Sequence, residues 1–341
     1  MIELHDDRLV FRFKEVHPHA SFSIDFQRTL RIPDDDRDYP LPPGLGSFPL
    51  RHVDDCVDRV PPAWLEHGGV MLPMYQSEAM WLNFSARWSM RGEYPFAVKI
   101  GTGKIDAVTG ETWQNELKRD PQDYVVVPEQ PWLDGYCVEK GVIRQFVAMP
   151  LGAGYTVEEQ LTDAAEHGGL QIIAYPMKRE AYERLVESRR VEEHVLAEAS
   201  MAMPASSAMG LAPGGRMRQK IYDDPYDFED WDLQHASRCF VHITNSLVWR
   251  AITGQEPPTV PPTAREYTDA GLPWFALYDG DREALEGAQN LRGLKSVKRL
   301  GEEKGDVPLS ENLPVDPEHV QRLRHGLTKH QVREWEVEKR T

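Results

Sequence analysis

The sequence of 341 residues has few cysteines and no long apolar run. Cys56, Cys137 and Cys239 are odd in number, widely spaced and without a Cys-x-x-Cys pair. They predict the reduced thiols of a cytoplasmic protein rather than a disulfide framework. The longest apolar stretches, CFVHI and WFALY, are far shorter than the ~20 residues of a membrane span. The N-terminus has no basic start before an apolar segment, so we expect no secretory signal and a soluble chain.

Positive charge is scarce as well. The chain has 39 Lys and Arg against 55 Asp and Glu, a formal net charge of −16. Nonspecific binding of nucleic acid needs a cationic surface that displaces counterions from phosphates. Docking on anionic lipid has the same requirement. We therefore expect neither nucleic acid nor a membrane among the partners.

The motifs of the common enzyme classes are also missing. The sequence has no Gly-x-Ser-x-Gly elbow, Rossmann fingerprint, kinase motif set, His-Glu-x-x-His or zinc-deaminase pattern. His-Gly-Gly, which supplies oxyanion donors in some esterases, occurs at 67–69 and 167–169. Without an elbow, we interpret both copies as turns into buried strands. Whether the protein is an enzyme stays open, because many active sites assemble from residues far apart in the chain.

Strand signals dominate the first half of the chain. In SFSIDFQ (21–27) apolar and polar residues alternate with period two. Segment 96–100 predicts a hairpin that turns at 101–103, and 123–150 predicts two β-branched runs with turns at Asp134-Gly135 and Lys140-Gly141. The run LQIIAYP (170–176) predicts a buried strand.

Helical spacing begins near residue 179. Apolar residues recur between charges over 179–200, the clearest helix pattern of the chain. We expect further helices over 230–250, whose centre CFVHI fits a strand equally well, and over 317–326, after the helix-start pair Asp316-Pro317. The expected fold class is α+β: an antiparallel β-rich core, either a sheet or a sandwich, with helices packed on it.

These patterns suggest three regions. Residues 1–178 form a β-rich region, 179–203 a helix, and 204–341 an α+β region. Tryptophan and other apolar residues lie on both sides of the break, which predicts that the two larger regions pack as one compact unit.

The stretch GLAPGGRMRQK (210–220) is a candidate anion site. Backbone N–H groups at Gly214 and Gly215 could hold an anion, with added charge from Arg216, Arg218 and Lys220. The stretch is not a nucleotide P-loop, because the Lys and the Ser or Thr of that motif are absent. The alternative is a turn into a half-exposed strand, with the three cations on one face and paired to nearby acids.

A second candidate site is RHVDDC (51–56). On a strand, His52, Asp54 and Cys56 would point the same way and offer nitrogen, oxygen and sulfur ligands to a divalent metal. The common Cys/His zinc spacings are absent. A structural role for the three residues is the alternative.

Four blocks of the sequence carry a resemblance: PLPPGLGSFPLRHVDD, QPWLDGYCVEKGVIRQFVAMPLGAGYTVEEQ, MGLAPGGRMRQKIYDDPY and GLPWFALYDGD. They are similar to an uncharacterised family of bacterial and fungal proteins, some of which are labelled "integral membrane protein". The resemblance covers most of residues 20–315 and implies no reaction. The membrane label conflicts with the short apolar runs.

Three functional hypotheses follow. The first is a binding or self-assembling protein whose stiff Pro- and Trp-rich loops, 33–50 and 257–267, engage a second copy of the chain or a protein partner. The second is an enzyme or sensor of a small phosphate- or carboxylate-bearing ligand at 210–220. The third is a metal-dependent enzyme at 51–56. No cofactor is indicated.

Overall fold

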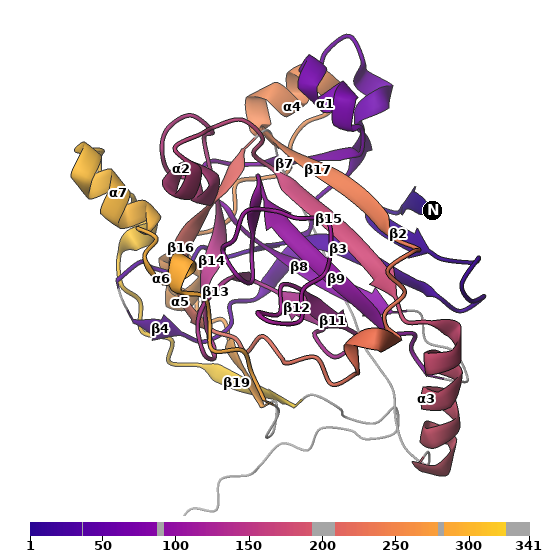
Figure 1. Ribbon diagram of the computed structural model, residues 1–341. Helices are drawn as coiled ribbons and strands as arrows, with labels where there is room; N and C mark the ends of the chain where they lie inside the picture. Colours follow the sequence, from indigo (N-terminus) through magenta and orange to yellow (C-terminus); the bar gives the residue numbers. More distant parts are fainter. Residues whose placement is uncertain (36, 87–91, 193–208, 279–282, 325–341) are drawn as a thin grey trace, which may run out of the picture.

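A ten-stranded sheet forms one layer of the core. The computed structural model describes residues 1–35, 37–86, 92–192, 209–278 and 283–324 (Figure 1). The strand order is β1-β2-β3-β8-β14-β16-β4, and β5, β12 and β13 pair with β3, β8 and β14. The bounds are β1 (Ile2–His5), β2 (Arg8–Arg12), β3 (Ser21–Thr29), β4 (Asp38–Tyr39), β5 (Gly44–Ser47), β8 (Ala79–Ala86), β12 (Trp132–Leu133), β13 (Gly135–Glu139), β14 (Val142–Met149) and β16 (Gly210–Arg218).

A seven-stranded sheet forms the second layer, and a two-stranded ribbon lies apart from both. The order in the second sheet is β10-β9-β15-β17-β7-β6, with β11 beside β9. The bounds are β6 (Arg51–His52), β7 (Val70–Met74), β9 (Phe96–Thr102), β10 (Ile105–Asp106), β11 (Val125–Val127), β15 (Leu170–Pro176) and β17 (Ser237–Asn245). The ribbon pairs β18 (Trp274–Tyr278) with β19 (Val320–Arg324) in parallel.

Aromatic side chains join the two large sheets. The strand predicted for 21–27 is confirmed as β3, whose Phe22, Ile24 and Phe26 are at most 1% exposed, although the polar Asp25 and Gln27 between and after them are buried as well. The ring of Phe22 lies 4.5 Å from that of Phe96 on β9. The hydroxyl of Tyr136 on β13 donates to Thr102 Oγ1 at 3.0 Å. The core therefore lies between the sheets.

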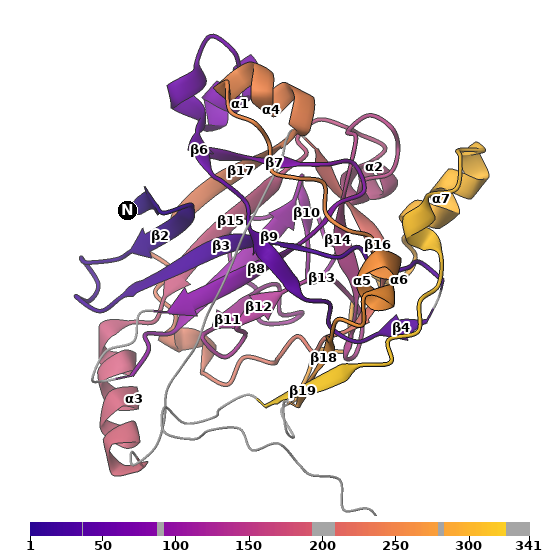
Figure 2. The ribbon, with the colours of Figure 1, turned by 180° about the vertical axis from the view of Figure 1, so that it is seen from behind.

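Short helices cover the rim of this core (Figures 1 and 2). α1 and α4 lie side by side at one end, α3 at the other, and α7 beside the far edge of the larger sheet. The fold is thus α+β with a β-rich core, as the sequence predicts. The bounds are α1 (Pro62–His67), α2 (Val157–Thr162), α3 (Arg179–Glu192), α4 (Ser246–Thr253), α5 (Ala264–Asp269), α6 (Gln289–Arg292) and α7 (Val297–Lys304), with 3-10 turns η1 (Val53–Cys56), η2 (Phe228–Asp230) and η3 (Ser310–Asn312).

Most strand predictions are confirmed. The predicted hairpin forms from β9 and β10, but it turns at 103–104 because residues 101 and 102 still pair with β10. β13 and β14 turn at Lys140-Gly141 as predicted, whereas Gly135 of the other predicted turn begins β13. β15 matches the predicted strand 170–176. The two His-Gly-Gly tripeptides lead directly into β7 and β15, as expected of turns into buried strands.

The helix predictions are confirmed only in part. α3 begins at residue 179, and residues 193–200 of the predicted helix lie outside the described part of the chain. The helix prediction for 230–250 is wrong up to residue 245, and the alternative, a strand at CFVHI, is confirmed as part of β17. There, Val241 and Ile243 fill the core from β17, which lies between β15 and β7. The prediction for 317–326 is also wrong up to residue 324, because 320–324 form β19, whose backbone pairs with β18, and residues 325–326 lie outside the described part of the chain.

The two larger regions of the sequence share both sheets. β14 pairs with β16 from Val142–Arg218 to Met149–Gly210, and β15 pairs with β17. Each sheet therefore contains strands from before residue 178 and from after residue 209. In the described part of the chain, no helix combines the length and the apolar character needed to cross a membrane.

Candidate functional site

The glycines of the predicted anion site lie inside a strand and not in an open bend. Residues 210–218 form β16, where Gly214 and Gly215 are buried. A Cβ on Gly214 would lie 2.5 Å from Cγ2 of Val147, and one on Gly215 would lie 2.4 Å from the carbonyl oxygen of Pro33. Both positions need glycine because neighbouring segments of the same chain approach so closely. Neither glycine offers an open anion cradle.

Arg216 is engaged in ion pairs with its own chain. Its two terminal nitrogens donate to the two carboxylate oxygens of Glu139 at 3.1 Å each, and its Nε donates to Asp38 at 2.9 Å. These carboxylates raise the pKa of Arg216, and the guanidinium in turn lowers the pKa of Glu139. Arg216 therefore fastens β16 to β13 and β4, which matches the structural alternative for this residue.

The last two cations of the stretch line a cavity. Burial alternates from Arg216 to Ile221, so the predicted single face for the three cations is correct. The cavity has a volume of about 320 Å³, at the lower end of the range of small-molecule sites. Its lining residues are Pro40, Leu41, Gln130, Pro131, Trp132, Gly141, Arg218, Gln219, Lys220, Tyr222, Phe275 and Ala276.

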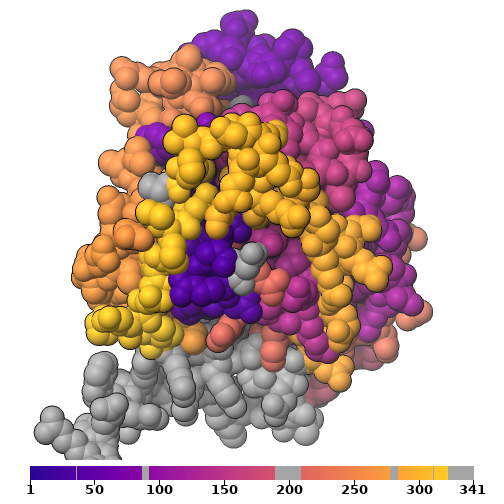
Figure 3. All heavy atoms as spheres, turned by 90° about the vertical axis from the view of Figure 1, so that its left-hand side faces the viewer, coloured from indigo at the N-terminus to yellow at the C-terminus, as the bar shows by residue number. Residues whose placement is uncertain are grey.

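Five parts of the chain build this cavity. They are the residues after β4, the start of β12 with the segment before it, the turn between β13 and β14, the end of β16 with the segment after it, and β18. Figure 3 views the molecule from the side where N-terminal atoms (indigo), central atoms (magenta and salmon) and C-terminal atoms (yellow) meet. Leu41 and Phe275 exchange two backbone hydrogen bonds of 2.7 and 2.9 Å. This bridge holds the ribbon of β18 against the larger sheet.

Two buried glutamines fix the floor of the cavity. Gln130 donates through Nε2 to the carbonyl of Trp132 at 2.9 Å and accepts through Oε1 from the N–H of Tyr222 at 3.0 Å. Gln219 donates to the same Trp132 carbonyl and accepts from the N–H of Asp134. The amides thus tie the segments around Trp132 and Tyr222 together and leave the floor well ordered.

The cavity is locally basic in an acidic protein. Arg218 is exposed, and its guanidinium forms no hydrogen bond or ion pair with any residue in the described ranges. Lys220 is half-buried on the same lining. None of the lining residues within the described ranges is acidic. Two cations in a partly apolar hollow favour an anion, because the low polarity strengthens charge-assisted hydrogen bonds.

A buried carboxyl lies behind the cavity wall. Asp134 is 4% exposed, and its Oδ2 has no hydrogen-bond partner among the described residues. Burial raises the pKa of Asp134 to about 7, and a hydrogen bond from the Trp132 side chain offsets part of that rise. The carboxyl therefore gains or loses its proton near neutral pH, directly behind an aromatic residue of the lining.

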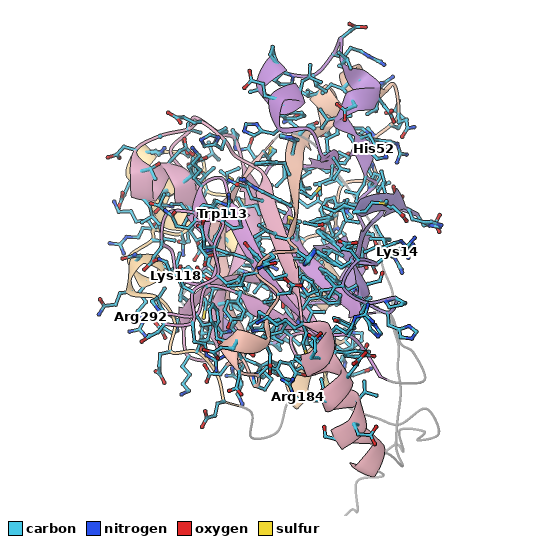
Figure 4. All side chains as sticks on the ribbon, turned by 45° about the vertical axis from the view of Figure 1, so that its right-hand side comes forward. Lys14, His52, Trp113, Lys118, Arg184 and Arg292 are labelled. Atoms are coloured by element: carbon cyan, nitrogen blue, oxygen red, sulfur yellow. The ribbon has the colours of Figure 1, made fainter. Side chains whose placement is uncertain are left out.

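The predicted metal ligands do not come together. β6 ends at His52, and η1 follows, so the three residues do not share one strand face. His52 and Asp54 are exposed, whereas Cys56 packs with Val53 and Trp249 in a small apolar cluster. His52 lies at the upper end of the molecule (Figure 4). Within the described ranges, no three His, Cys, Asp or Glu side chains are placed to hold a metal ion.

Cys137 and Cys239 offer no activated thiol. All three are free and buried, which agrees with the expectation of unpaired thiols. Burial raises the pKa of both Cys137 and Cys239 to about 12. Such thiols are protonated at neutral pH and are poor nucleophiles.

Sequence reasoning missed most of the cavity. Arg218 and Lys220 were found because they are cations beside glycines. Leu41, Trp132 and Phe275 lie far from them in the sequence, and no local pattern links these segments. Trp132 is half-exposed although it is large and apolar, but exposure becomes visible only in the fold.

Comparison of the chain with family models, with curated proteins and with solved structures found no match. The resemblance to an uncharacterised family therefore stays a prediction.

Proposed function

We propose that this protein binds a small organic anion in the cavity lined by Arg218 and Lys220. The observation that carries this proposal is the charge of the lining, whose described residues include two cations and no acid, in a chain of net charge −16. Acids elsewhere on the surface repel an anion, so a local basic hollow is where one would gather. The function is that of a ligand-binding protein, with or without a reaction on the bound anion.

The self-assembly hypothesis is less well supported. It rested on two stiff loops, and both are fastened to their own chain. Tyr39 and Phe48 of the first loop are buried. In the second loop, the carbonyls of Pro258 and Thr259 accept hydrogen bonds from Tyr75 and Arg28. Because these loop residues are already bound to their own chain, we favour anion binding over self-assembly. A homo-oligomer stays a prediction that native mass spectrometry would test.

The test removes the two cations. We expect the variant carrying both Arg218→Gln and Lys220→Gln to bind anions about tenfold or more weakly, since each lost charge-assisted bond contributes more than 1 kcal/mol. Isothermal titration calorimetry with inorganic phosphate and with indole-3-acetate measures the effect. Lys140→Gln is the matched control, because Lys140 is an exposed cation of the nearby turn that does not line the cavity.

Two outcomes would contradict the proposal. Either neither anion binds the unmodified protein, or an anion binds equally well to the double variant. Circular dichroism of each variant shows whether its fold is retained.

A further inference from the structure

The lining that carries the two cations also has apolar walls. Leu41, Pro131 and Phe275 contribute aliphatic and aromatic surface, and Trp132 adds a half-exposed indole. Large half-exposed aromatic residues gain free energy when a ligand covers them, at about 25 cal/mol per Å² of apolar surface removed from water. A bare inorganic anion would leave these walls in contact with water.

The two glutamine amides of the lining are already hydrogen-bonded to the protein. Both amide groups of Gln130 and Gln219 bond backbone atoms of the surrounding loops: Trp132 O, Lys220 O and Tyr222 N for Gln130, and Trp132 O and Asp134 N for Gln219. A sugar or another polyol would bring many hydroxyl groups that these amides cannot satisfy. Buried hydroxyls without partners cost binding free energy.

The walls are held in place before a ligand arrives. The Leu41–Phe275 bridge positions one side, and the two glutamines position the segment that carries Trp132. A site that is already ordered loses little conformational entropy on binding. Its volume of about 320 Å³ suits a ligand of one or two rings rather than a dinucleotide.

We propose that the ligand is an aromatic or similarly flat apolar monoanion, with its body against Trp132 and Phe275 and its single anionic group on Arg218 and Lys220. This inference rests on the proposed function and adds the chemical class of the ligand. It excludes inorganic phosphate and polyols as the preferred ligands of the cavity.

Four probes separate the contribution of the aromatic ring to binding from that of the anionic group. Indole-3-acetate has both, and indole-3-acetamide has the ring without the charge. Acetate has the charge without the ring, and inorganic phosphate has more charge and no ring. Calorimetry on the full chain is expected to give indole-3-acetate an affinity about tenfold or more above each of the other three. In saturation-transfer NMR, the ring protons of indole-3-acetate should receive more saturation than its methylene protons.

A substitution of Trp132 tests the role of the aromatic wall. Trp132→Leu is expected to weaken indole-3-acetate about fivefold, through lost ring contact, and to leave acetate unchanged. Leu247→Ala is the control, because Leu247 is 80% exposed on α4 and does not line the cavity. If Trp132→Leu does not fold, the ring-proton pattern in the unmodified protein still decides.

The outcomes distinguish the two proposals. If phosphate or acetate binds within about threefold of indole-3-acetate and depends on Arg218, the ligand class is wrong and the anion-binding function stands. Equal affinities for indole-3-acetate and indole-3-acetamide also overturn the ligand class. If no anionic probe binds, or none depends on Arg218, the proposed function itself fails.

Discussion

The two halves of the stretch 214–220 both carry cations but lie in different surroundings. Gly214, Gly215 and Arg216 are held by the protein itself, through close backbone contact and two ion pairs. Arg218 and Lys220, two and four residues beyond Arg216, line a cavity with apolar walls. The difference shows that a glycine-and-cation pattern combines two separate demands, tight packing in a strand and charge at a site.

The largest expected effect is a loss of stability from a substitution in residues 214–216, the half of the stretch that is packed in the strand. Gly215→Ala would place a Cβ 2.4 Å from a backbone oxygen, and such overpacking should lower the free energy of unfolding by about 3 kcal/mol. Urea denaturation followed by circular dichroism measures it. Gly293→Ala is the matched control, because the nearest atom to its new Cβ lies 3.8 Å away. Equal stability of the Gly215 variant and the unmodified protein would show that β16 does not pack as described.

The next effect is on the pH dependence of stability and concerns Asp134, the carboxyl behind the cavity wall. The pKa of Asp134 is about 7 in the fold, well above that of an unfolded aspartate, so the native state binds more protons between about pH 4 and 7. Its contribution to stability therefore falls as pH rises through this window. Asp134→Asn removes that dependence and should gain about 2 kcal/mol relative to the unmodified protein between pH 5 and pH 8.

The measurement is urea unfolding at both pH values. The exposed Asp223 supplies a control in Asp223→Asn, which makes the same substitution at the surface. A constant difference for Asp134→Asn would mean that the carboxyl is ionised throughout.

The features that could be predicted from the sequence are those that local periodicity determines. Alternation from Arg216 to Ile221 is a period-two pattern that the residues themselves carry, and it is correct. The role of Gly215 depends on Pro33, which is about 180 residues away in the chain. Likewise, Cys239 to Ile243 fits both a strand and a helix locally, and only pairing with β15 and β7 decides for a strand. Long-range contacts, which no local pattern encodes, therefore define both the close glycines and the cavity.

The smallest expected effect sharpens the comparison between two arginines of one strand. Arg216→Met should lower the free energy of unfolding by about 1 kcal/mol, a modest loss because both carboxylate partners are partly exposed. It should leave the affinity for indole-3-acetate unchanged. Arg218→Met should do the reverse, with stability altered by less than about 0.5 kcal/mol and affinity reduced. Urea unfolding and calorimetry on both variants measure the two quantities. If Arg216→Met weakens binding as much as Arg218→Met, the two halves act together and the ion pairs of Arg216 must open for the anion.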